Sequence, residues 1–242
     1  LAQQKPERFE PDWASSLNNC ANHLANMGQH DRALEMAQQA LDIYQRLAQQ
    51  KPERFEPEWA GSLNNCANRL ADMGQHDRAL EVAQQALGIY QRLALRLPKV
   101  HAITAHNAAL NLALWHWIDS GQEMTNVLSQ DLPDGHVHQL LELQYVRKAM
   151  RALYLHSAPI ELFQVSAVEA TNAWLQLDRG QQQSNETWFH LSTALAVHRL
   201  GIDSAPKGWL ALWQAYRVRM KHGLPKWMEK GIRRCGAEFP LP

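Results

Sequence analysis

The apolar positions of this chain recur at helical spacing, and they do so in the same order twice. Residues 1–46 and 47–92 differ at only six positions, so the pattern has a period of 46 residues. In the first copy Leu17, Ala21 and Leu24 follow the three- and four-residue spacing of an amphipathic helix. A second apolar series of the same kind follows after a glycine. Because a fixed period of this length is typical of stacked repeats, the sequence predicts an all-α repeat array.

Prolines and glycines predict where these helices begin and end. Pro11 suits the first turn of a helix, which places the start of the first helix there. Gly28 is expected to end this helix, since glycine adopts a positive φ readily. The second helix is expected to end at Lys51-Pro52, because the residue before a proline disfavours helical backbone. The same start and end signals recur in the second copy at Pro57, Gly74 and Pro98.

Small residues mark the places where the two helices of a repeat must approach closely. The order of Gly28, Ala33 and Ala40 resembles the tetratricopeptide repeat, although the unit is longer than the usual 34 residues. The length and the segment Leu-Asn-Asn-Cys-Ala at 17–21 look like the long subtype found in kinesin light chains and in many bacterial signalling and defence proteins. The resemblance implies a right-handed superhelix of helical hairpins. It also implies a function in protein–protein interaction.

The repeat departs from the family at two pairs of positions. Cysteine stands at Cys20 and Cys66, where leucine is usual, and alanine stands at Ala37 and Ala83, where an aromatic residue is usual. These changes alter packing rather than fold. The two cysteines occupy equivalent positions of adjacent repeats, which places them too far apart for a disulfide.

A third, eroded copy begins at Leu93, in which Asn111 falls on Asn65 and Gly121 takes the role of Gly74 one residue late. We therefore expect a repeat array over residues 1–130 and a helical region over residues 131–242 that caps the array with degenerate hairpins. A loop is predicted at 129–135 and a turn at 178–183. Helices are predicted over 138–155, 159–177, 184–200 and 206–222, with a short one from Pro225. Leu1 to Gln4 match the end of a second helix, so we interpret the chain as a piece of a longer array.

The charge of the chain is balanced, with 24 basic and 24 acidic residues. Residues 201–242 alone are basic, with eight Lys and Arg against three Asp and Glu. This tail could contact nucleic acid, but a broad basic face is the usual footprint, so we favour a solvated helix face. No apolar run is long enough for a membrane span and no secretory signal is visible, so we expect a cytoplasmic protein with no membrane partner.

The polar residues of the first helix of each repeat give the best candidate site. They recur one helical turn apart and in register between the copies, which makes a ladder of donors and acceptors. Amide groups can bind the backbone of an extended peptide without requiring a particular side chain. The resemblance implies this role for Asn18, Asn19, Asn64 and Asn65, and the alternative is that the amides bridge neighbouring helices. The predicted partner-binding residues are Ser15, Asn18, Asn19, Asn22, Asn26, Asn64, Asn65, Asn68, Asp72 and Asn111, with Gly61 at the position of Ser15.

Tryptophan is concentrated in the second half of the chain. Aromatic residues at helical spacing usually pack inward, so we interpret most of them as core. Trp209 and Trp213 share a helix face, and with Arg217 they form a candidate second patch for a partner.

Catalytic and metal-binding interpretations find little support. His136, His138 and Glu142 lack the third or fourth ligand that a zinc site needs. Cys235 with His190 or His198 would have to form a nucleophile and base, but no catalytic signature surrounds it. The chain also lacks a glycine-rich phosphate loop. We therefore expect no enzymatic activity, no cofactor and no metal.

The sequence thus predicts a scaffold or sensor arm that binds a partner protein or peptide in the groove of the repeats. By resemblance, arrays of this kind often accompany an effector enzyme such as a peptidase or nuclease. The alternatives are a homotypic assembly module and an accessory domain that contacts nucleic acid through the basic tail.

Overall fold

The computed structural model describes residues 6–124, 127–128, 131, 137–200 and 226–234. Every regular element within these ranges is a helix, and they contain no strand. The described residues fall into two compact units. The first holds the residues up to Trp115 together with Lys226 and Trp227, and the second holds those from His116 to Leu200 together with Met228 to Arg234. The predicted all-α repeat fold is confirmed, while the predicted domain boundary near residue 130 stays a prediction.

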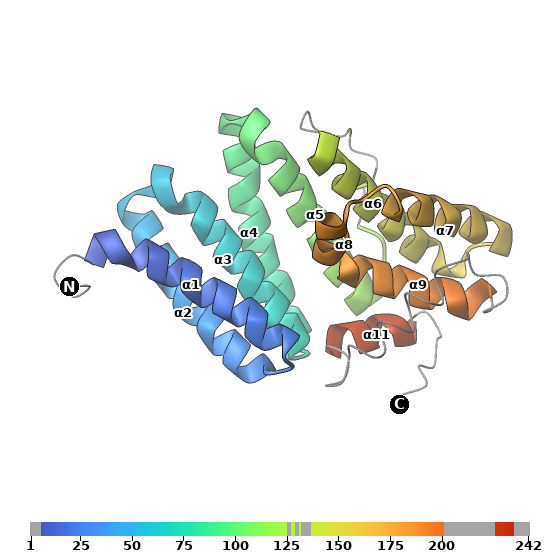
Figure 1. Ribbon diagram of the computed structural model, residues 1–242, viewed down its shortest axis with the longest axis horizontal. Helices are drawn as coiled ribbons and strands as arrows, with labels where there is room; N and C mark the ends of the chain where they lie inside the picture. The colour runs from blue at the N-terminus through green and yellow to red at the C-terminus, as the bar shows by residue number, and fades with distance from the viewer. Residues whose placement is uncertain (1–5, 125–126, 129–130, 132–136, 201–225, 235–242) are drawn as a thin grey trace. The chain divides into compact units, whose positions relative to one another are not determined.

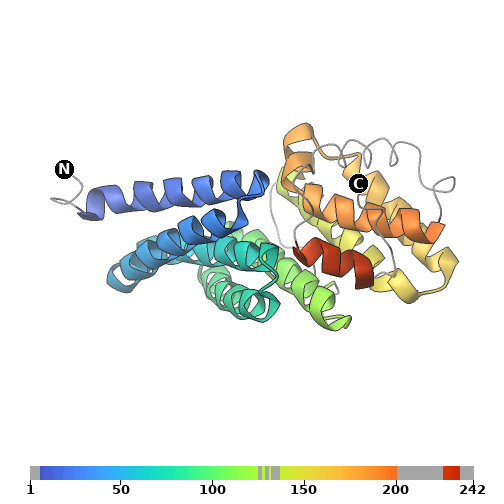
Figure 2. The ribbon, with the colours of Figure 1, turned by 90° about the horizontal axis from the view of Figure 1, so that it is seen from below.

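Four helices of equal length build the repeat array of the first unit (Figures 1 and 2). They are α1 (Pro6–Asn26), α2 (His30–Gln50), α3 (Pro52–Asp72) and α4 (His76–Arg96), each of 21 residues. Each helix packs against the next along the chain, and α1 also contacts α3. The same side chains recur at the contacts of both copies. Tetratricopeptide-type hairpins are expected to pack in this consecutive way.

The small residues lie where the helices of a hairpin meet. Ala21, Ala33 and Ala40 have no exposed surface, as the sequence predicted. The hydroxyl of Tyr44 donates a hydrogen bond of 2.9 Å to the backbone carbonyl of Pro11, which joins α2 to α1. An ion pair between the same two helices joins Arg46 to Glu10 at 2.8 Å, and the second copy repeats it between Arg92 and Glu56 at 3.6 Å.

The predicted start of the first helix is wrong by five residues. The helices begin at Pro6 and Pro52, and Pro11 and Pro57 lie inside them. Pro52 occupies the favoured first turn, and the carbonyl of Lys51 already accepts hydrogen bonds from the next turn. Phe55 is buried in that turn and anchors it in the core. This tertiary contact outweighs the backbone hydrogen bond that the internal proline forfeits.

The ends of the first helices follow the prediction. Gly28, Gly74 and Gly121 all adopt a positive φ, of 75°, 75° and 78° respectively. This conformation costs an L-residue with a Cβ free energy, so glycine at these three positions stops the helix and turns the chain. Gly121 therefore has the role predicted for it in the third copy.

Helix α5 (Pro98–Ser120) differs from the helices before it because its apolar residues surround it on all sides. A helix of this composition is typically buried. Most side chains from Ala105 to Ile118 are indeed buried, and Trp117 and Ile118 have no exposed surface.

The second unit contains three helices that contact one another in pairs: α6 (Val137–Tyr154), α7 (Ile160–Trp174) and α9 (Glu186–Leu200) (Figure 1). Its shorter elements are a 3₁₀ turn, η2 (Leu155–Ser157), then α8 (Arg179–Ser184) and α11 (Lys226–Arg234), whose first two residues belong to the first unit. The core stacks Trp174 on Phe189 with ring centroids 4.2 Å apart, and Tyr145 lies 5.2 Å from Trp174.

The predicted turn at 178–183 is wrong, because these residues form a short helix capped by Asp178. Asp178 caps α8 by accepting from the backbone N–H groups of Gly180 and Gln181, and the side chain of Gln181 accepts in return from the N–H of Asp178. This reciprocal capping box satisfies donors at the helix start. The predicted helix over 206–222 lies outside the described residues, as does most of the predicted loop at 129–135.

The core interpretation of the tryptophans is confirmed for five of them. Trp115, Trp117, Trp174, Trp188 and Trp227 are all buried. Trp209 and Trp213 lie outside the described residues.

Candidate partner-binding surface

The predicted polar residues of α1 lie along one side of the helix. Ser15, Asn19, Asn22 and Asn26 are exposed, and Asn18 is half-buried at the edge of this stripe. The apolar side chains of the same helix, such as Leu17 and Ala21, are buried on the other side. A helix with polar residues on the side opposite its core contacts is a normal amphipathic surface helix. The structure therefore leaves Asn19, Asn22 and Asn26 accessible to a partner.

The equivalent residues of α3 are less accessible. Asn64, Asn65 and Asn68 are half-buried, and so is Asn111 on α5. Within the described part of the chain, the side chains of Asn19, Asn22, Asn65 and Asn68 make no hydrogen bond with another residue. We call these four residues the amide stripe. Accessible side-chain amides without protein partners can donate to and accept from the polar groups of a ligand.

Asn18 has a structural contact. Its side-chain amide donates a hydrogen bond of 2.8 Å to the hydroxyl of Ser62, which is fully buried between α1 and α3. The Oδ1 atom of Asn18 is buried without a partner among the described residues. The alternative interpretation of the ladder, that amides bridge neighbouring helices, thus holds for this residue.

One of the differences between the repeats also has a packing explanation. Ser15 hydrogen-bonds the hydroxyl of Tyr44, whose pKa is raised by burial first and by Glu58 and Asp12 next. In the second copy Gly61 replaces Ser15, and a Cβ there would lie 3.5 Å from the hydroxyl of Tyr90. This position therefore contacts the second helix of its own repeat.

Asp72, the last predicted residue on α3, is bound by other residues of this protein and not left open to a partner. Its side chain is buried and accepts a hydrogen bond of 3.0 Å from the indole Nε1 of Trp227, and Arg69 forms an ion pair with it at 3.2 Å. Trp227 also packs edge-on against Trp115, with centroids 5.0 Å apart. Burial raises the pKa of the Asp72 carboxyl, and the charges of Arg69 and His30 and the Trp227 bond oppose this rise.

The environment of Asp72 leads to a prediction of how its substitution changes the stability of the protein. Because the pKa is raised in the folded protein, the folded state binds a proton more readily than the unfolded state, and the buried charge lowers stability at neutral pH. Asp72→Asn removes the charge and keeps an acceptor for Trp227. We expect it to be at least as stable as the wild type at pH 7, with a difference that shrinks as the pH falls through the raised pKa. Asp72→Ala should lose about 1–3 kcal/mol, since Trp227 is left unpaired.

The matched control is Asn26→Asp, which creates the second-repeat residue at the exposed position of α1. Urea denaturation between pH 4 and 8 measures all three variants. Asn26→Asp should stay within about 0.5 kcal/mol of the wild type at every pH. If the free energy of unfolding of Asp72→Asn varied with pH as that of the wild type does, the Asp72 carboxyl would not be the group that causes the variation.

The other predicted sites fall largely outside the described residues. These include Trp209, Trp213, Arg217, Cys235 and His136, and the side chains of His138, His190 and His198 are not described either. Within the described part of the chain, no group of three or more His, Cys, Asp or Glu side chains is placed to hold a metal ion. None of the described helices combines the length and the apolar character needed to cross a bilayer. Cys20 and Cys66 are both free thiols, as the sequence predicted.

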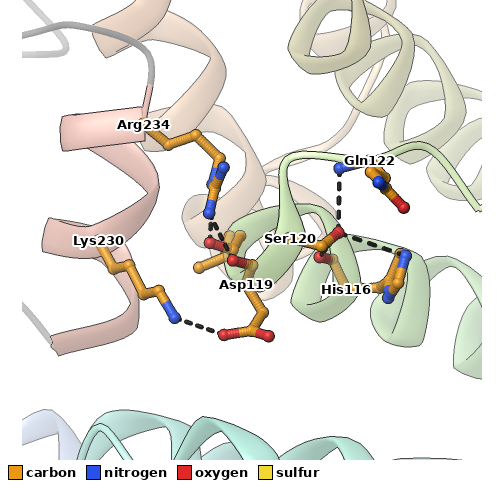
Figure 3. Close-up of polar contacts among 7 residues, drawn as sticks. His116, Asp119, Ser120, Gln122, Lys230 and Arg234 are labelled. Carbon is orange, nitrogen blue, oxygen red and sulfur yellow. Dashed lines mark hydrogen bonds and ion pairs between the residues drawn. The ribbon is translucent and has the colours of Figure 1, made fainter.

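A polar cluster at the end of α5 brings a serine and a histidine together (Figure 3). Ser120 Oγ lies 3.3 Å from His116 Nε2, donates to the backbone carbonyl of His116 at 2.8 Å, and accepts from the N–H of Gln122 at 3.0 Å. A nucleophilic serine must deliver its proton to the histidine. Here the hydroxyl is committed to a backbone carbonyl one helical turn back. The arrangement therefore ends the helix and does not form a catalytic pair.

Two basic residues of α11 complete this helix end. Arg234 donates to the backbone carbonyls of Ile118 at 2.9 Å and of Asp119 at 2.5 Å, and Lys230 pairs with the Asp119 carboxylate at 2.5 Å (Figure 3). The last carbonyls of a helix lack intrahelical donors and carry partial negative charge, so cations there are stabilising. This explains two charges of the basic tail without a nucleic acid.

The sequence did not reveal either contact made by α11. Trp227 and Arg234 meet residues more than a hundred positions earlier, and local patterns carry no signal for such pairs. The available hint was the change from Asn26 to Asp72, because a charged residue in one copy alone suggests a different neighbour.

Comparison with known families supports the repeat interpretation. Residues 13–51 and 59–94 match the family model described as tetratricopeptide repeat. These two segments of the N-terminal part are therefore similar to tetratricopeptide repeats, which generally mediate protein–protein interactions. Neither curated proteins nor solved structures give a match.

Proposed function

We propose that this protein binds an extended segment of a partner protein along the amide stripe of α1 and α3. The observation that carries the proposal is that Asn19, Asn22, Asn65 and Asn68 recur in register on the two first helices without protein partners among the described residues. Side-chain amides offer both donors and acceptors, which matches the alternating groups of a peptide backbone. The protein then acts as a scaffold or sensor arm in the cytoplasm, and an effector enzyme is one class of partner.

The stripe has definite limits at both sides. Asn18 is used in the contact with Ser62, and Asp72 holds Trp227, so these two residues are not offered to the partner in this arrangement. The peptide would follow the middle of the two helices. The 46-residue length of the unit supports the long, kinesin-light-chain-like subtype as part of this proposal.

A double substitution tests the proposal. We expect Asn19→Ala with Asn65→Ala to weaken binding of a peptide selected against the wild type from a random displayed library. Each lost hydrogen bond contributes about 0.5–1.5 kcal/mol, so together they should raise Kd roughly 5- to 150-fold. Titration calorimetry measures Kd, and thermal denaturation checks that the fold is retained.

The control variant removes two side-chain amides from the second helices of the repeats, outside the amide stripe. Gln39 and Gln85 are exposed, repeat-equivalent amides on the second helices, so Gln39→Ala with Gln85→Ala should leave Kd unchanged. A loss of stability in the asparagine variant that accounts for the weaker binding would show that the stripe is structural. Equal effects of the two double variants would also contradict the proposal.

A further inference from the structure

The turn between α4 and α5 exposes three large apolar side chains (Figure 1). Leu95, Leu97 and Val100 are 86%, 56% and 63% exposed, and they lie within six residues of one another. We call residues 95–100 the Leu97 turn. Single exposed apolar residues are normal on a protein surface, but a group of them is typical of an interaction surface.

Stacking of a further repeat does not account for the exposure of the Leu97 turn. The equivalent positions of the preceding repeat are Gln49, Lys51 and Arg54, where α2 is followed by α3. All three are exposed, although the helices α3 and α4 follow them and complete a repeat. A further repeat in the same arrangement would therefore leave the Leu97 turn exposed as well. These solvent-facing positions are polar in one repeat and apolar in the next.

The Leu97 turn also lies in a stretch of the chain that has no acidic residue. Residues 82–118 contain three Lys and Arg but neither Asp nor Glu. The equivalent residues of the preceding repeat, 36–72, contain five Asp and Glu. Within the turn itself, Lys99 stands at the position of Glu53. The turn therefore combines apolar side chains with positive charge.

The cations at this turn are available to a ligand. Arg92 and Arg96 share the carboxylate of Glu56 at 3.6 and 3.4 Å, so one negative charge faces two positive charges. Their side chains are nevertheless 52% and 59% exposed. Lys99 is exposed and forms no ion pair with any residue that the structure describes. This combination is complementary to a surface that is apolar beneath a layer of negative charge.

We propose that the Leu97 turn binds the surface of a bilayer that contains anionic lipids. The three apolar side chains enter the interface of the bilayer, and Arg96 and Lys99 contact lipid phosphates. A protein partner fits less well, because three side chains at one turn offer much less than the about 800 Å² that each partner buries in a specific interface. A bilayer requires no complementary shape, so each apolar group and each cation contributes separately.

This contact differs both from a membrane span and from the amide stripe. The expectation of no membrane partner rested on the lack of an apolar run long enough to span a bilayer, and contact with the surface needs no such run. The cytoplasmic leaflet carries anionic lipids, which agrees with the location proposed for the protein. The amide stripe lies on α1 and α3, so a bound peptide and a bilayer would use different side chains.

Flotation of the whole chain with lipid vesicles tests the proposal. The vesicles contain phosphatidylcholine either alone or mixed with phosphatidylserine, and the fraction of protein that floats gives the partition coefficient. We expect binding to the mixed vesicles and little binding to the neutral ones, because the cations supply much of the affinity. Leu95→Gln with Leu97→Gln and Val100→Gln keeps every charge. This triple variant should lower the partition coefficient at least about tenfold, since three apolar groups no longer leave water.

Two charge variants locate the contact on the molecule. Arg96→Gln with Lys99→Gln should lower the partition coefficient roughly 30-fold, at about 1 kcal/mol for each cation close to an anionic surface. The control, Arg32→Gln with Arg78→Gln, removes two exposed cations from the starts of α2 and α4. Arg78 is about 27 Å from Arg96 along α4, well beyond the Debye length, so the control should change the partition coefficient less than about threefold. The circular dichroism of all variants should match the wild type, because every substituted side chain is exposed.

Four results would overturn the proposal. The first is equal flotation of the wild type with mixed and with neutral vesicles. The second is wild-type binding by the glutamine triple variant, which would reduce the contact to attraction between charges. The third is an equal loss of binding in the two charge variants, which would place the contact elsewhere. The fourth is self-association without vesicles, measured by light scattering, that the triple variant abolishes, because a second copy of the chain would then occupy the turn.

Discussion

Phe55→Ala should lower the free energy of unfolding by about 3–5 kcal/mol, the usual loss for a phenylalanine removed from a core. Phe55 is 5% exposed and belongs to the cluster that joins α2 to α3. It also anchors the extra helical turn between Pro52 and Pro57. Its removal therefore leaves a cavity and weakens the start of α3, and the urea midpoint of the helical signal measures the loss.

The first repeat provides the control for this prediction. Phe9 occupies the same position and is 36% exposed. A partly exposed side chain buries less apolar area, so Phe9→Ala should cost less than half as much as Phe55→Ala. Equal losses for the two variants would contradict the conclusion that stacking of the second repeat on the first buries this position.

Gly121→Ala has the second large expected effect. Gly121 has a φ of 78°, and a Cβ there would collide with the Arg234 guanidinium. The positive φ costs an alanine about 1–2 kcal/mol, and displaced Arg234 would leave two α5 carbonyls unpaired. We expect a total loss of about 2–4 kcal/mol from these two causes, measured by thermal denaturation.

Gly88→Ala is the matched control and should act in the opposite direction. Gly88 lies inside α4, its φ is not positive, and a Cβ there would meet no atom within 4 Å. Alanine in a helix interior is about 0.5–1 kcal/mol more favourable than glycine, so this variant should be more stable than the wild type. If Gly121→Ala were tolerated as well as Gly88→Ala, the helix end would not depend on the contact with Arg234.

The sequence was most informative where the structure depends on local pattern. The helical hairpins, the turns at Gly28 and Gly74 and the burial of Ala21, Ala33 and Ala40 all follow from periodicity and from the backbone preference of glycine. The start of α1 was missed, because the burial of Phe55 that supports this turn in α3 is a tertiary effect. The short helix α8 was missed because its polar residues resemble a turn, while its capping box depends on reciprocal side-chain contacts.

The candidate site was predictable in position but not in detail. Repetition alone placed Asn19, Asn22 and Asn26 on one side of α1, where the structure exposes them. It could not show that Asn18 would bind Ser62 or that Asp72 would hold Trp227, because these contacts depend on segments distant in the chain. It also could not show that Ser62 and Cys66 would be buried on α3 while the equivalent Ser16 and Cys20 are exposed on α1, since the two sequences are the same there.

Side-chain amide NMR of protein labelled with ¹⁵N-asparagine tests the central claim most directly. We predict that a peptide selected from a displayed library shifts the side-chain amide signals of Asn19, Asn22, Asn65 and Asn68. The signal of Asn185, whose buried amide donates to the Gln181 carbonyl at 2.9 Å, should stay in place. Saturated binding that leaves the signals of Asn19 and Asn65 unmoved would contradict the account.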